Sequence, residues 1–579
     1  MSPRIYASSY PSVPLKSGSI FTHLLSVDSN NDGLIGGFPG QEKVFVDAAT
    51  GTALTRRQFR SLALRFGYGL RHDSRINARR GDTILIFSPN SLAYPVLLLG
   101  AIAAGLRCTL ANNAYTAREL RHQYTNSGAN IIISTSDGLT TALEVLKESG
   151  FTLDEAEKRI IVAPSGFAWA GGPAKSESSR GIPFDQLLGL GELHEEEQFE
   201  GEETTLLCYS SGTTGLPKGV ETSHLNLTTS TQAIPKVCGY DPGEQILMFL
   251  PFYHIYGVVA GIFLSIICGA TTILMPRFDP IEFCISVEKY RVTYVPIVPP
   301  VMLAIARHPV VDKYDLSSIR ALFCSAAPVS PALLKEGMTR LRARRKPEQV
   351  LYVTEGYGMT EAAPATHMLP LDLSASKSGS VGVLLPNFQA RLVADDSGDN
   401  IIDAEDGMPG ELWVKGPTMM KGYLNNPAAN QASFTADRWF KTGDMCIRDK
   451  EGFYYIVDRK KELIKYKGFQ VPPAELEGVL ITHPEVADAA VIGVESEAEA
   501  TELPRAYIVP SQPTQVSTTE SKRAFEKSVA QWMETKVTRH KYLRGGVVVI
   551  DVIPKSASGK ILRRELRELA KHEAVRSKL

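Results

Sequence analysis

Between residues 209 and 219 the chain reads YSSGTTGLPKG, directly after a β-branched run that predicts a buried strand. The glycines of this segment allow the backbone to turn tightly and to approach a ligand closely. Its hydroxyls and loop amides can bind phosphate oxygens, and Lys218 adds a positive charge. The spacing is not that of a Walker A loop, because Pro217 stands where the second glycine of that motif belongs. The segment therefore predicts a phosphate-binding loop of another type.

Further segments of specified spacing follow this loop in order along the chain. They are LPFYHIYG (250–257), EGYGMTE (355–361), GELWVKG (410–416), KTGD (441–444), VDRKKELIKYKGFQVPPAELE (457–477) and IPKSASGKILRREL (553–566). Taken together, roughly residues 40 to 570 resemble the adenylate-forming enzymes, which include acyl- and aryl-CoA ligases, peptide-synthetase adenylation domains and beetle luciferases. The sequence is most similar to the 4-coumarate–CoA-ligase-like branch.

The resemblance implies an ATP-dependent acyl-CoA ligase that uses ATP, Mg²⁺ and coenzyme A. A free carboxylate is a poor acyl donor, because its charge repels nucleophiles and its oxide is a bad leaving group. Attack of the carboxylate on the α-phosphorus of ATP gives an acyl-adenylate and releases pyrophosphate. AMP then leaves when a thiolate takes the acyl group. Both steps build charge on oxygens, so the catalyst needs positioning and fixed positive charge.

Most of the site residues that the resemblance implies bind the nucleotide. Tyr357 would stack on adenine, Thr360 would bind the α-phosphate, and Asp444 would bind the ribose with Arg459 as its partner. Glu361 would help to hold Mg²⁺, which needs few protein ligands beside phosphate oxygens. The full nucleotide set is Ser210, Ser211, Gly212, Thr213, Thr214, Gly215, Lys218, Glu355, Gly356, Tyr357, Thr360, Asp444, Arg459, Lys461, Gln470 and Lys560.

The resemblance also implies that a small domain serves the two half-reactions in turn. Lys560 would bridge the substrate carboxylate and the α-phosphate during adenylation. Another face of the same domain, with Lys465, would reach the site for thioester formation, and Lys461 lies at the hinge position. The implied catalytic residues are Lys560, Lys465, His254 and Thr360, and the implied coenzyme A residues are Arg277, Lys467 and Gly468.

The acyl pocket is expected to be apolar. By resemblance it is lined by His254, Tyr256, Ala260, Ala326, Gly358, Pro364 and Ala365, with His254 at its entrance. Plant coumarate ligases typically have Lys-Ser where this chain has Phe323-Cys324, and alanines replace a common Ser at 260 and a common Val at 365. These changes remove polar groups that could face a ring hydroxyl and enlarge the apolar volume. They favour a medium-chain, branched or aryl-aliphatic acid over 4-coumarate.

The last three residues, Ser577, Lys578 and Leu579, match the peroxisomal targeting signal that an import receptor reads. They follow a charged segment with helical spacing. Peroxisomes consume acyl-CoA thioesters, so the address agrees with the chemistry. The sequence is also similar to peroxisomal acyl-CoA ligases of fungi, including those of secondary-metabolite pathways. We therefore expect a peroxisomal enzyme, with the import receptor and a small carboxylic acid as partners.

The elements that position these residues alternate between short β-branched runs and longer helical patterns from residue 82 onward. This predicts an α/β fold, with a large N-terminal domain of doubly wound sheets over residues 1–458. After residue 380, short strands with Gly and Asp turns predict a β-rich subdomain. Residues 459–579 predict a small mobile α+β domain. Division into domains is expected, because the 579 residues of the whole chain exceed the roughly 250–300 at which a single core stops growing.

The composition excludes several classes. The chain has 62 Lys+Arg against 63 Asp+Glu, which provides no general field for nucleic acid. Seven scattered cysteines without a C-x-x-C pair argue against a disulfide framework or a zinc ribbon. The apolar stretches 83–106 and 245–276 each divide into strand-like and helix-like pieces, so we expect buried segments and no membrane span. The N-terminus has no apolar core of a secretory signal.

Three alternatives stay open at this point. A luciferase-like monooxygenase would share these motifs. A carrier-loading enzyme is disfavoured because no carrier domain follows the Lys560 loop in this sequence. An inactive acyl- or nucleotide-binding protein is disfavoured because the residues implied in catalysis are present. The sequence does not identify the acid, the pathway, the acceptor, the oligomeric state or the resting orientation of the small domain.

Overall fold

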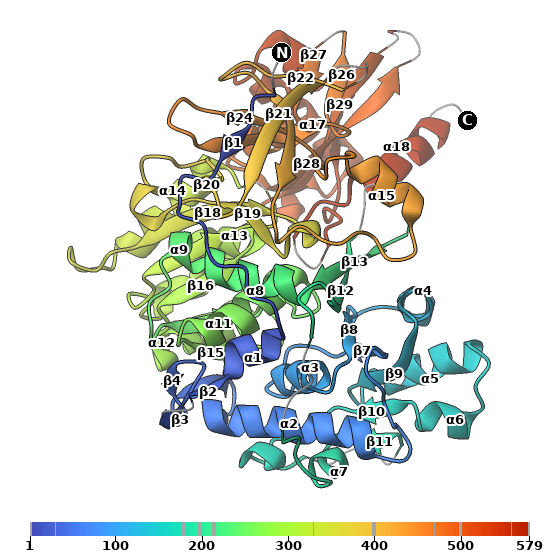
Figure 1. Cartoon of the computed structure of the whole chain (residues 1–579). Helices are drawn as coiled ribbons and strands as arrows, with labels where there is room; N and C mark the ends of the chain where they lie inside the picture. Colours follow the sequence, from blue (N-terminus) through green and yellow to red (C-terminus); the bar gives the residue numbers. More distant parts are fainter. Residues whose placement is uncertain are drawn as a thin grey trace.

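The computed structural model describes residues 3–28, 31–175, 180–194, 199–210, 216–327, 329–396, 401–467, 469–496, 499, 501–556 and 559–576. Figure 1 shows the blue and green N-terminal half forming the lower body of the molecule, with the orange and red C-terminal quarter above it. The predicted α/β class, with a large N-terminal and a smaller C-terminal part, is confirmed.

The phosphate-loop segment borders a sheet that has seven strands in the described part of the chain. Its order is β11 (Ile182–Pro183), β10 (Ile160–Val162), β9 (Ala129–Ser134), β7 (Thr83–Phe87), β8 (Arg107–Leu110), β12 (Thr204–Ser210) and β13 (Lys218–Ser223). β11 to β12 run parallel, and only β13 pairs antiparallel. These strands correspond to the β-branched runs of the sequence. Helices cover both faces of a parallel sheet, so its strands are buried on both sides and consist largely of apolar, β-branched residues.

A second sheet has nine strands among the described residues. Its order is β20 (Val383–Leu384), β19 (Ala365–Met368), β18 (Tyr352–Gly358), β17 (Ala321–Cys324), β16 (Tyr294–Ile297), β14 (Gln245–Met248), β15 (Thr271–Leu274), β5 (Lys43–Asp47) and β6 (Ala53–Thr55). β18 to β5 are parallel, whereas β19, β20 and β6 pair antiparallel. Ligands of such sheets bind beyond the carboxyl ends of the parallel strands. β18 ends there with Tyr357 and Gly358.

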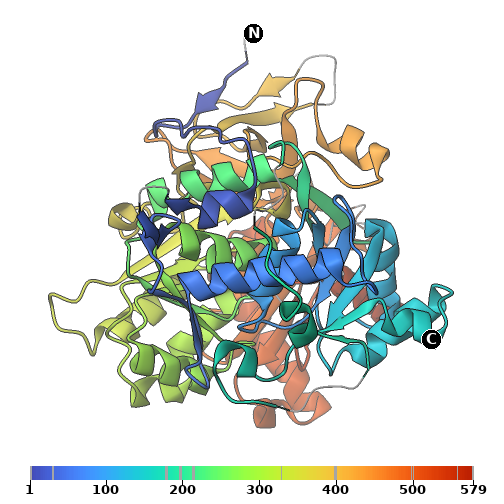
Figure 2. The same ribbon diagram turned by 60° about the horizontal axis from the view of Figure 1, so that its bottom comes forward.

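Two helices that pack closely on each other support these sheets. α3 (Tyr94–Ala103) is buried along its whole length, as its apolar sequence predicts. It packs on α2 (Arg56–His72), and Figure 2 shows α2 crossing the front of the molecule. A Cβ at Gly100 would lie 2.6 Å from the carbonyl oxygen of Ala63, so only glycine permits this approach.

A third, antiparallel sheet forms the β-rich subdomain predicted after residue 380. It contains β1 (Tyr6–Ala7), β21 (Gln389–Asp395), β22 (Ile402–Asp403), β23 (Gly410–Lys415), β24 (Phe440–Arg448) and β25 (Tyr454–Arg459). The N-terminal strand β1 pairs with β21, which lies almost 400 residues away in the sequence. This sheet carries Asp444 and Arg459 on neighbouring strands.

The C-terminal part has its own core. β26 (Ile464–Tyr466) and β27 (Phe469–Val471) form a hairpin, and β28 (Val486–Ser496), β29 (Thr501–Pro510) and β30 (Val547–Val549) form a sheet. Around them lie α16 (Pro473–Leu480), α17 (Thr519–Glu534) and α18 (Arg563–Arg576). The main core cluster runs from Ile20 to Tyr454, and a separate cluster begins at Ile464. The domain boundary at 458/459 stays a prediction; it falls at the end of β25.

In the described residues, no helix is long and apolar enough to cross a membrane. The two apolar stretches of the sequence, 83–106 and 245–276, each divide into strands and helices, as expected. Residues 83–106 form β7 and α3, and residues 245–276 form β14, α10 (Ile255–Val258), the short helices that follow it and β15.

Candidate active site

The phosphate-loop segment joins β12 to β13 across the edge of the seven-stranded sheet. Ser210 and Lys218 face each other in register at the ends of these strands. The ammonium group of Lys218 lies 4.7 Å from the ring centre of Tyr423. Five predicted nucleotide residues of the loop lie outside the described residues: Ser211, Gly212, Thr213, Thr214 and Gly215. The structure therefore places the two ends of the loop and not its tip.

At the end of β18, Tyr357 meets the third sheet. Its hydroxyl donates a hydrogen bond of 2.5 Å to Oδ2 of Asp444 on β24. The other oxygen of Asp444, Oδ1, lies 3.2 Å from Nε of Arg459 on β25. Asp444 is only 6% exposed, so these two partners satisfy a carboxylate that would otherwise be costly to bury. Burial, followed by the nearby Asp444 charge, raises the pKa of Tyr357 well above its ordinary value.

The residues after β18 form a short turn that holds Thr360 and Glu361. Thr360 is buried, and the carbonyl of Glu361 accepts a 2.8 Å hydrogen bond from the amide of Met420. The hydroxyl of Tyr423 donates to Oε1 of Glu361 over 2.8 Å. Tyr423 thus contacts both Glu361 and Lys218. The sequence prediction missed it, although it lies in the glycine- and asparagine-rich segment MKGYLNN between two of the motifs.

The side chains of the site can bind Mg²⁺ only together with oxygen ligands from a substrate. The described residues contain no group of three or more His, Cys, Asp or Glu side chains that could hold a metal. A single carboxylate such as Glu361, beside the phosphates of a nucleotide, is the arrangement in which Mg²⁺ is commonly bound. The residues present therefore fit a Mg²⁺ ion that arrives with ATP.

Lys560 lies in a turn of the C-terminal part, where its carbonyl accepts from the amide of Ser556 over 2.8 Å. Burial, followed by the charge of Arg459, lowers the pKa of Lys560 to about 8, against the opposing charges of Asp444 and Glu361. Lys560 therefore lies close enough to Asp444 of β24, Arg459 at the end of β25 and Glu361 after β18 for their charges to act on it. The structure thus joins one residue of the small domain to the nucleotide set of the large one.

His254 lies near enough to Lys560 to be affected by its charge. It caps α10, where Nδ1 accepts a 3.2 Å hydrogen bond from the amide of Tyr256. Burial lowers the pKa of His254 to about 4, with a further contribution from the charge of Lys560. The imidazole is therefore neutral at physiological pH, and the acceptor role of Nδ1 puts its proton on Nε2.

The predicted acyl-pocket residues lie at the end of β18, at or just before the start of β19, on or just before α10, on the short helix Val259–Phe263 that follows α10, and in the turn after β17. The hydroxyl of Tyr256 donates to the carbonyl of Phe323 over 3.1 Å, and their rings meet edge-on at 6.0 Å. Ala260 is buried, and Ala326 has a φ of 75°. A Cβ at Gly358 would lie 2.0 Å from the carbonyl oxygen of Pro364, so this pair requires glycine.

Glu355 lies on β18, directly before this group. It is 8% exposed, and Oε1 accepts a 3.0 Å hydrogen bond from the amide of Gly379. Burial raises its pKa to about 7. Glu355 lies in register with Cys324 on the neighbouring strand β17. The neighbouring Gly356 faces the ring of Phe323, since a Cβ there would lie 2.6 Å from Cζ.

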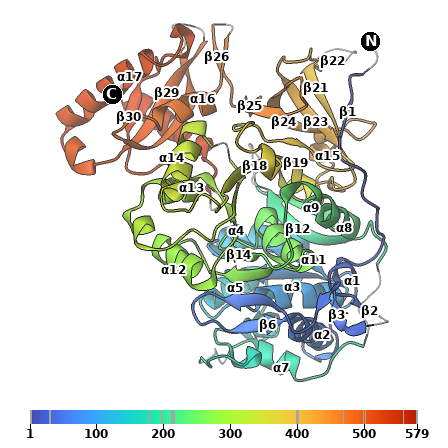
Figure 3. The ribbon, with the colours of Figure 1, turned by 90° about the vertical axis from the view of Figure 1, so that its left-hand side faces the viewer.

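The structure does not bring the predicted thioester residues to Lys560. Lys465 and Gln470 face each other on the exposed hairpin β26–β27, and Figure 3 shows β26 at the outer top of the molecule. Lys467 pairs with Glu499 over 2.8 Å. The hairpin packs on β29 of the small domain. Lys461 is exposed before the hairpin, Arg277 is exposed after β15 in the large domain, and Gly468 lies outside the described residues, as do Ser577, Lys578 and Leu579.

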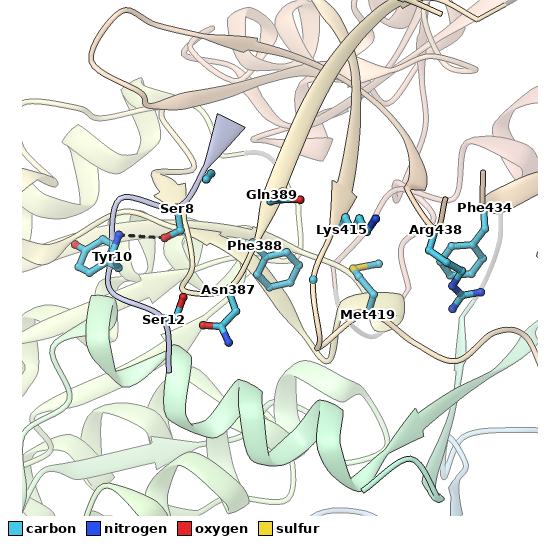
Figure 4. A pocket seen from close by; sticks show the side chains of 12 residues that line it. Ser8, Tyr10, Ser12, Asn387, Phe388, Gln389, Lys415, Met419, Phe434 and Arg438 are labelled. Carbon is cyan, nitrogen blue, oxygen red and sulfur yellow. Dashed lines mark hydrogen bonds between the residues drawn. The ribbon is translucent and has the colours of Figure 1, made fainter. Parts of the chain in front are cut away.

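A separate pocket of about 470 Å³ lies between the N-terminal segment and the third sheet. Figure 4 shows Tyr10, Phe388, Lys415 and Phe434 around it. The ammonium group of Lys415 donates a 2.8 Å hydrogen bond to the carbonyl of Asp437, so it already has a partner within the protein. The pocket contains none of the predicted site residues.

Comparisons with known proteins agree with this geometry. Residues 36–424 match the family described as AMP-binding enzyme, and residues 475–560 match the AMP-binding enzyme C-terminal domain. "Probable 4-coumarate--CoA ligase 1" of Dictyostelium discoideum is 36% identical over 504 residues, which cover 86% of this chain and 87% of that protein. "4-coumarate-CoA ligase 1" of Narcissus pseudonarcissus is 35% identical over 541 residues, which cover 90% of both.

Two solved structures are similar over almost the whole chain. The anthranilate CoA ligase AuaEII in complex with anthranoyl-AMP has a TM-score of 0.81 at 21% identity and covers 97% of this chain and 99% of its own, which supports the fold alone. The O-succinylbenzoate coenzyme A synthetase of Bacillus subtilis, in complex with ATP and magnesium ion, has a TM-score of 0.72 at 27% identity. It covers 91% of this chain and 96% of its own.

Proposed function

Because the chain belongs to the AMP-binding enzyme family and is an AMP-forming acid–CoA ligase of the 4-coumarate–CoA-ligase-like kind, we propose that its acid is medium-chain, branched or aryl-aliphatic. One observation carries this proposal. Tyr256 donates its hydroxyl to the backbone of Phe323, and alanines stand at 260, 326 and 365 in the rest of the pocket set. Such a wall favours apolar substrate atoms over a ring hydroxyl.

Each residue of the site has a separate role in the adenylation step. The substrate carboxylate attacks the α-phosphorus of ATP, the bond to the β-phosphate oxygen breaks, and pyrophosphate leaves with the electron pair. We propose that Lys560 stabilises the negative charge shared by the carboxylate and the α-phosphate, that Asp444 and Tyr357 hold the nucleoside, and that Lys218 binds phosphate. Fixed charges of this kind act most strongly in a site that excludes water.

We propose that Mg²⁺ accompanies the ATP and that Glu361 provides its protein ligand, with Tyr423 fixing the carboxylate through its hydroxyl. Bound there, the ion would neutralise phosphate charge. Removal of Mg²⁺ with EDTA should abolish pyrophosphate release, and added Mg²⁺ should restore it. Turnover that is unaffected by EDTA would contradict the assignment.

The substrate class is tested by measuring pyrophosphate and AMP release over a panel of carboxylic acids, with and without coenzyme A. We expect medium-chain, branched or aryl-aliphatic acids to exceed 4-coumarate in kcat/KM, with thioester formed only when coenzyme A is present. A higher kcat/KM for 4-coumarate would reject the substrate proposal. Pyrophosphate without thioester would indicate a carrier arm or oxygen as acceptor, and ATP binding without turnover would indicate a binding protein.

We also propose a peroxisomal location, supported by the Ser577-Lys578-Leu579 ending, with the import receptor as partner. A fluorescent protein fused to the N-terminus should colocalise with peroxisomes, and deletion of the three residues should disperse it. Equal distribution of both fusions would reject the signal. We place the enzyme in a fungal secondary-metabolite pathway, because the sequence resembles fungal ligases of that kind. Unchanged metabolites in a host that lacks the gene would contradict this placement.

A further inference from the structure

The helix α13 (Pro299–Arg307) of the large domain contacts the small domain at both of its ends. At its start, Pro300 packs against the turn that carries Lys560, since a Cβ at Gly559 would lie 2.9 Å from Cδ of Pro300. At its end, the guanidinium group of Arg307 reaches the segment that follows α16. Figure 3 shows α13 and α14 directly below the small domain.

Arg307 binds two backbone carbonyls of the small domain. Nη2 donates to the carbonyl of Ile481 over 3.2 Å, and Nη1 donates to that of Val486 over 3.4 Å. Ile481 is the C-terminal cap of α16, where free carbonyls and the helix dipole favour a positive charge. A single side chain of the large domain thus spans the end of α16 and the start of β28.

A carboxylate on the neighbouring helix aligns this guanidinium. Glu336 lies on α14 (Pro331–Arg342), and its two oxygens accept from Nε and Nη2 of Arg307 over 3.2 and 3.3 Å. This two-point contact fixes the plane of the guanidinium and turns its remaining donors toward the small domain. A further contact lies beside it, because a Cβ at Gly478 of α16 would be 3.6 Å from Cβ of Ser330, the cap of α14.

We infer that Arg307 is a positioning residue for adenylation, which holds the small domain in the orientation that places Lys560 beside Asp444, and that Glu336 orients Arg307 for this purpose. The inference rests on the proposed role of Lys560. The Lys560 turn and the α16 end belong to one small domain, so fixing α16 also fixes the turn. The contacts of Arg307 join the two domains in this orientation, and a turn of the small domain away from α13 would break them, so they favour the first half-reaction over the second.

The experiment compares the two half-reactions in full-length variants. Adenylation is followed by pyrophosphate release, and thioester formation is followed from supplied acyl-adenylate and coenzyme A. Arg307→Ala should slow adenylation by about threefold to tenfold, as expected for two partly exposed hydrogen bonds, and leave thioester formation from supplied acyl-adenylate within about twofold of wild type. Arg307→Lys should restore part of the rate, and Glu336→Gln should lower adenylation by a smaller factor.

Arg121→Ala is the matched control. Arg121 pairs with Glu148 over 3.4 Å between helices of the large domain and is similarly exposed, so this variant should change neither half-reaction. Equal losses in both half-reactions of Arg307→Ala, or no loss in either, would overturn the inference. A wild-type enzyme that releases pyrophosphate but forms no thioester would instead reject coenzyme A as acceptor, and adenylation by Arg307→Ala would still decide the role of Arg307.

Discussion

The hydroxyl of Tyr357 and the carboxylate of Asp444 are joined by a 2.5 Å hydrogen bond, although the two residues belong to different sheets. Tyr357 ends a strand of the nine-stranded sheet, whereas Asp444 lies within the antiparallel sheet beside Arg459. The contact closes the corner between the sheets at the point where the parallel strands end. A residue expected to stack on a base and one expected to bind a ribose are therefore held together by the protein itself.

Replacement of Asp444 by Ala should raise the KM for ATP strongly. The substitution removes the acceptor of Tyr357 and leaves Arg459 without its partner, and hydrogen bonds to a charged group contribute roughly 1.5–3 kcal/mol each. We expect kcat/KM for ATP, measured by pyrophosphate release, to fall by about 10- to 100-fold. Tyr357→Phe keeps the ring and loses only the hydroxyl, so the kcat/KM of this variant for ATP should fall by only a few-fold. An unchanged KM in Asp444→Ala would contradict the nucleoside role.

Lys560→Ala should separate the two half-reactions. If its ammonium group stabilises the charge that develops in adenylation, pyrophosphate release should fall by about 10²–10³-fold, a loss typical of removing one such group. Thioester formation from supplied acyl-adenylate should remain within a few-fold of wild type. Lys555→Ala is a control from the same segment, because Lys555 pairs with Asp488 inside the small domain over 2.6 Å. Equal losses of both half-reactions in Lys560→Ala would refute the division of labour.

The pH profile of adenylation should report the same group. Lys560 has a pKa of about 8 because it is buried and lies near Arg459, so it is charged below that pH and loses its proton above it. We expect kcat/KM for the adenylation step to fall as pH rises through about 8. In Lys560→Arg the residual activity should lose this basic limb, since a guanidinium keeps its proton. A limb that persists unchanged in that variant would belong to another residue.

Much of the fold follows from the sequence, because each buried parallel strand is a short β-branched run between helical patterns. The wholly apolar segment that became α3 was predicted as a buried helix and is confirmed. The strand β29 was not predicted, since its sequence TELPRAYIVP alternates irregularly and contains two prolines; it is defined by its long pairing with β28. Pairing between distant segments is a tertiary property that local patterns do not carry.

The site was predicted in part, for a related reason. The motifs single out residues that are expected to contact a shared ligand, and the structure brings two of these, Lys560 and Asp444, near each other from distant parts of the chain. Residues that contact only other groups of the protein are not marked by a sequence motif of this kind. Tyr423 reaches Glu361 across 62 residues, and Arg307 reaches Ile481 across 174. The basic run from 459 to 467 is also divided by the fold: Arg459 pairs with Asp444, Lys460 with Glu411 and Lys467 with Glu499.

Glu355→Gln should stabilise the protein at neutral pH. Burial raises the pKa of Glu355 from 4.5 to about 7, so the folded state keeps a proton that the unfolded state has lost. Stability therefore falls as pH rises from about 4.5 to about 7, by on the order of 3 kcal/mol, and this cost persists above pH 7. Glutamine is neutral throughout and can still accept from the amide of Gly379. The urea midpoint of the variant should exceed that of wild type more at about pH 7.5 than at about pH 5, and an equal difference at both would reject the assignment.

Lys467→Ala should produce the opposite pattern to Lys560→Ala. Lys467 is exposed after β26 and pairs with Glu499 of the same domain. Adenylation by this variant should stay within about twofold of wild type, because the orientation seen here does not use the hairpin. Thioester formation from supplied acyl-adenylate should fall by about tenfold or more if the hairpin must reach coenzyme A, as loss of one charge-assisted contact suggests. Lys536→Ala, which changes an exposed lysine just after α17 in the same domain, should affect neither step. If Lys467→Ala slowed adenylation as much as thioester formation, the hairpin would be acting through stability, and the small domain would have no separate face for the second half-reaction.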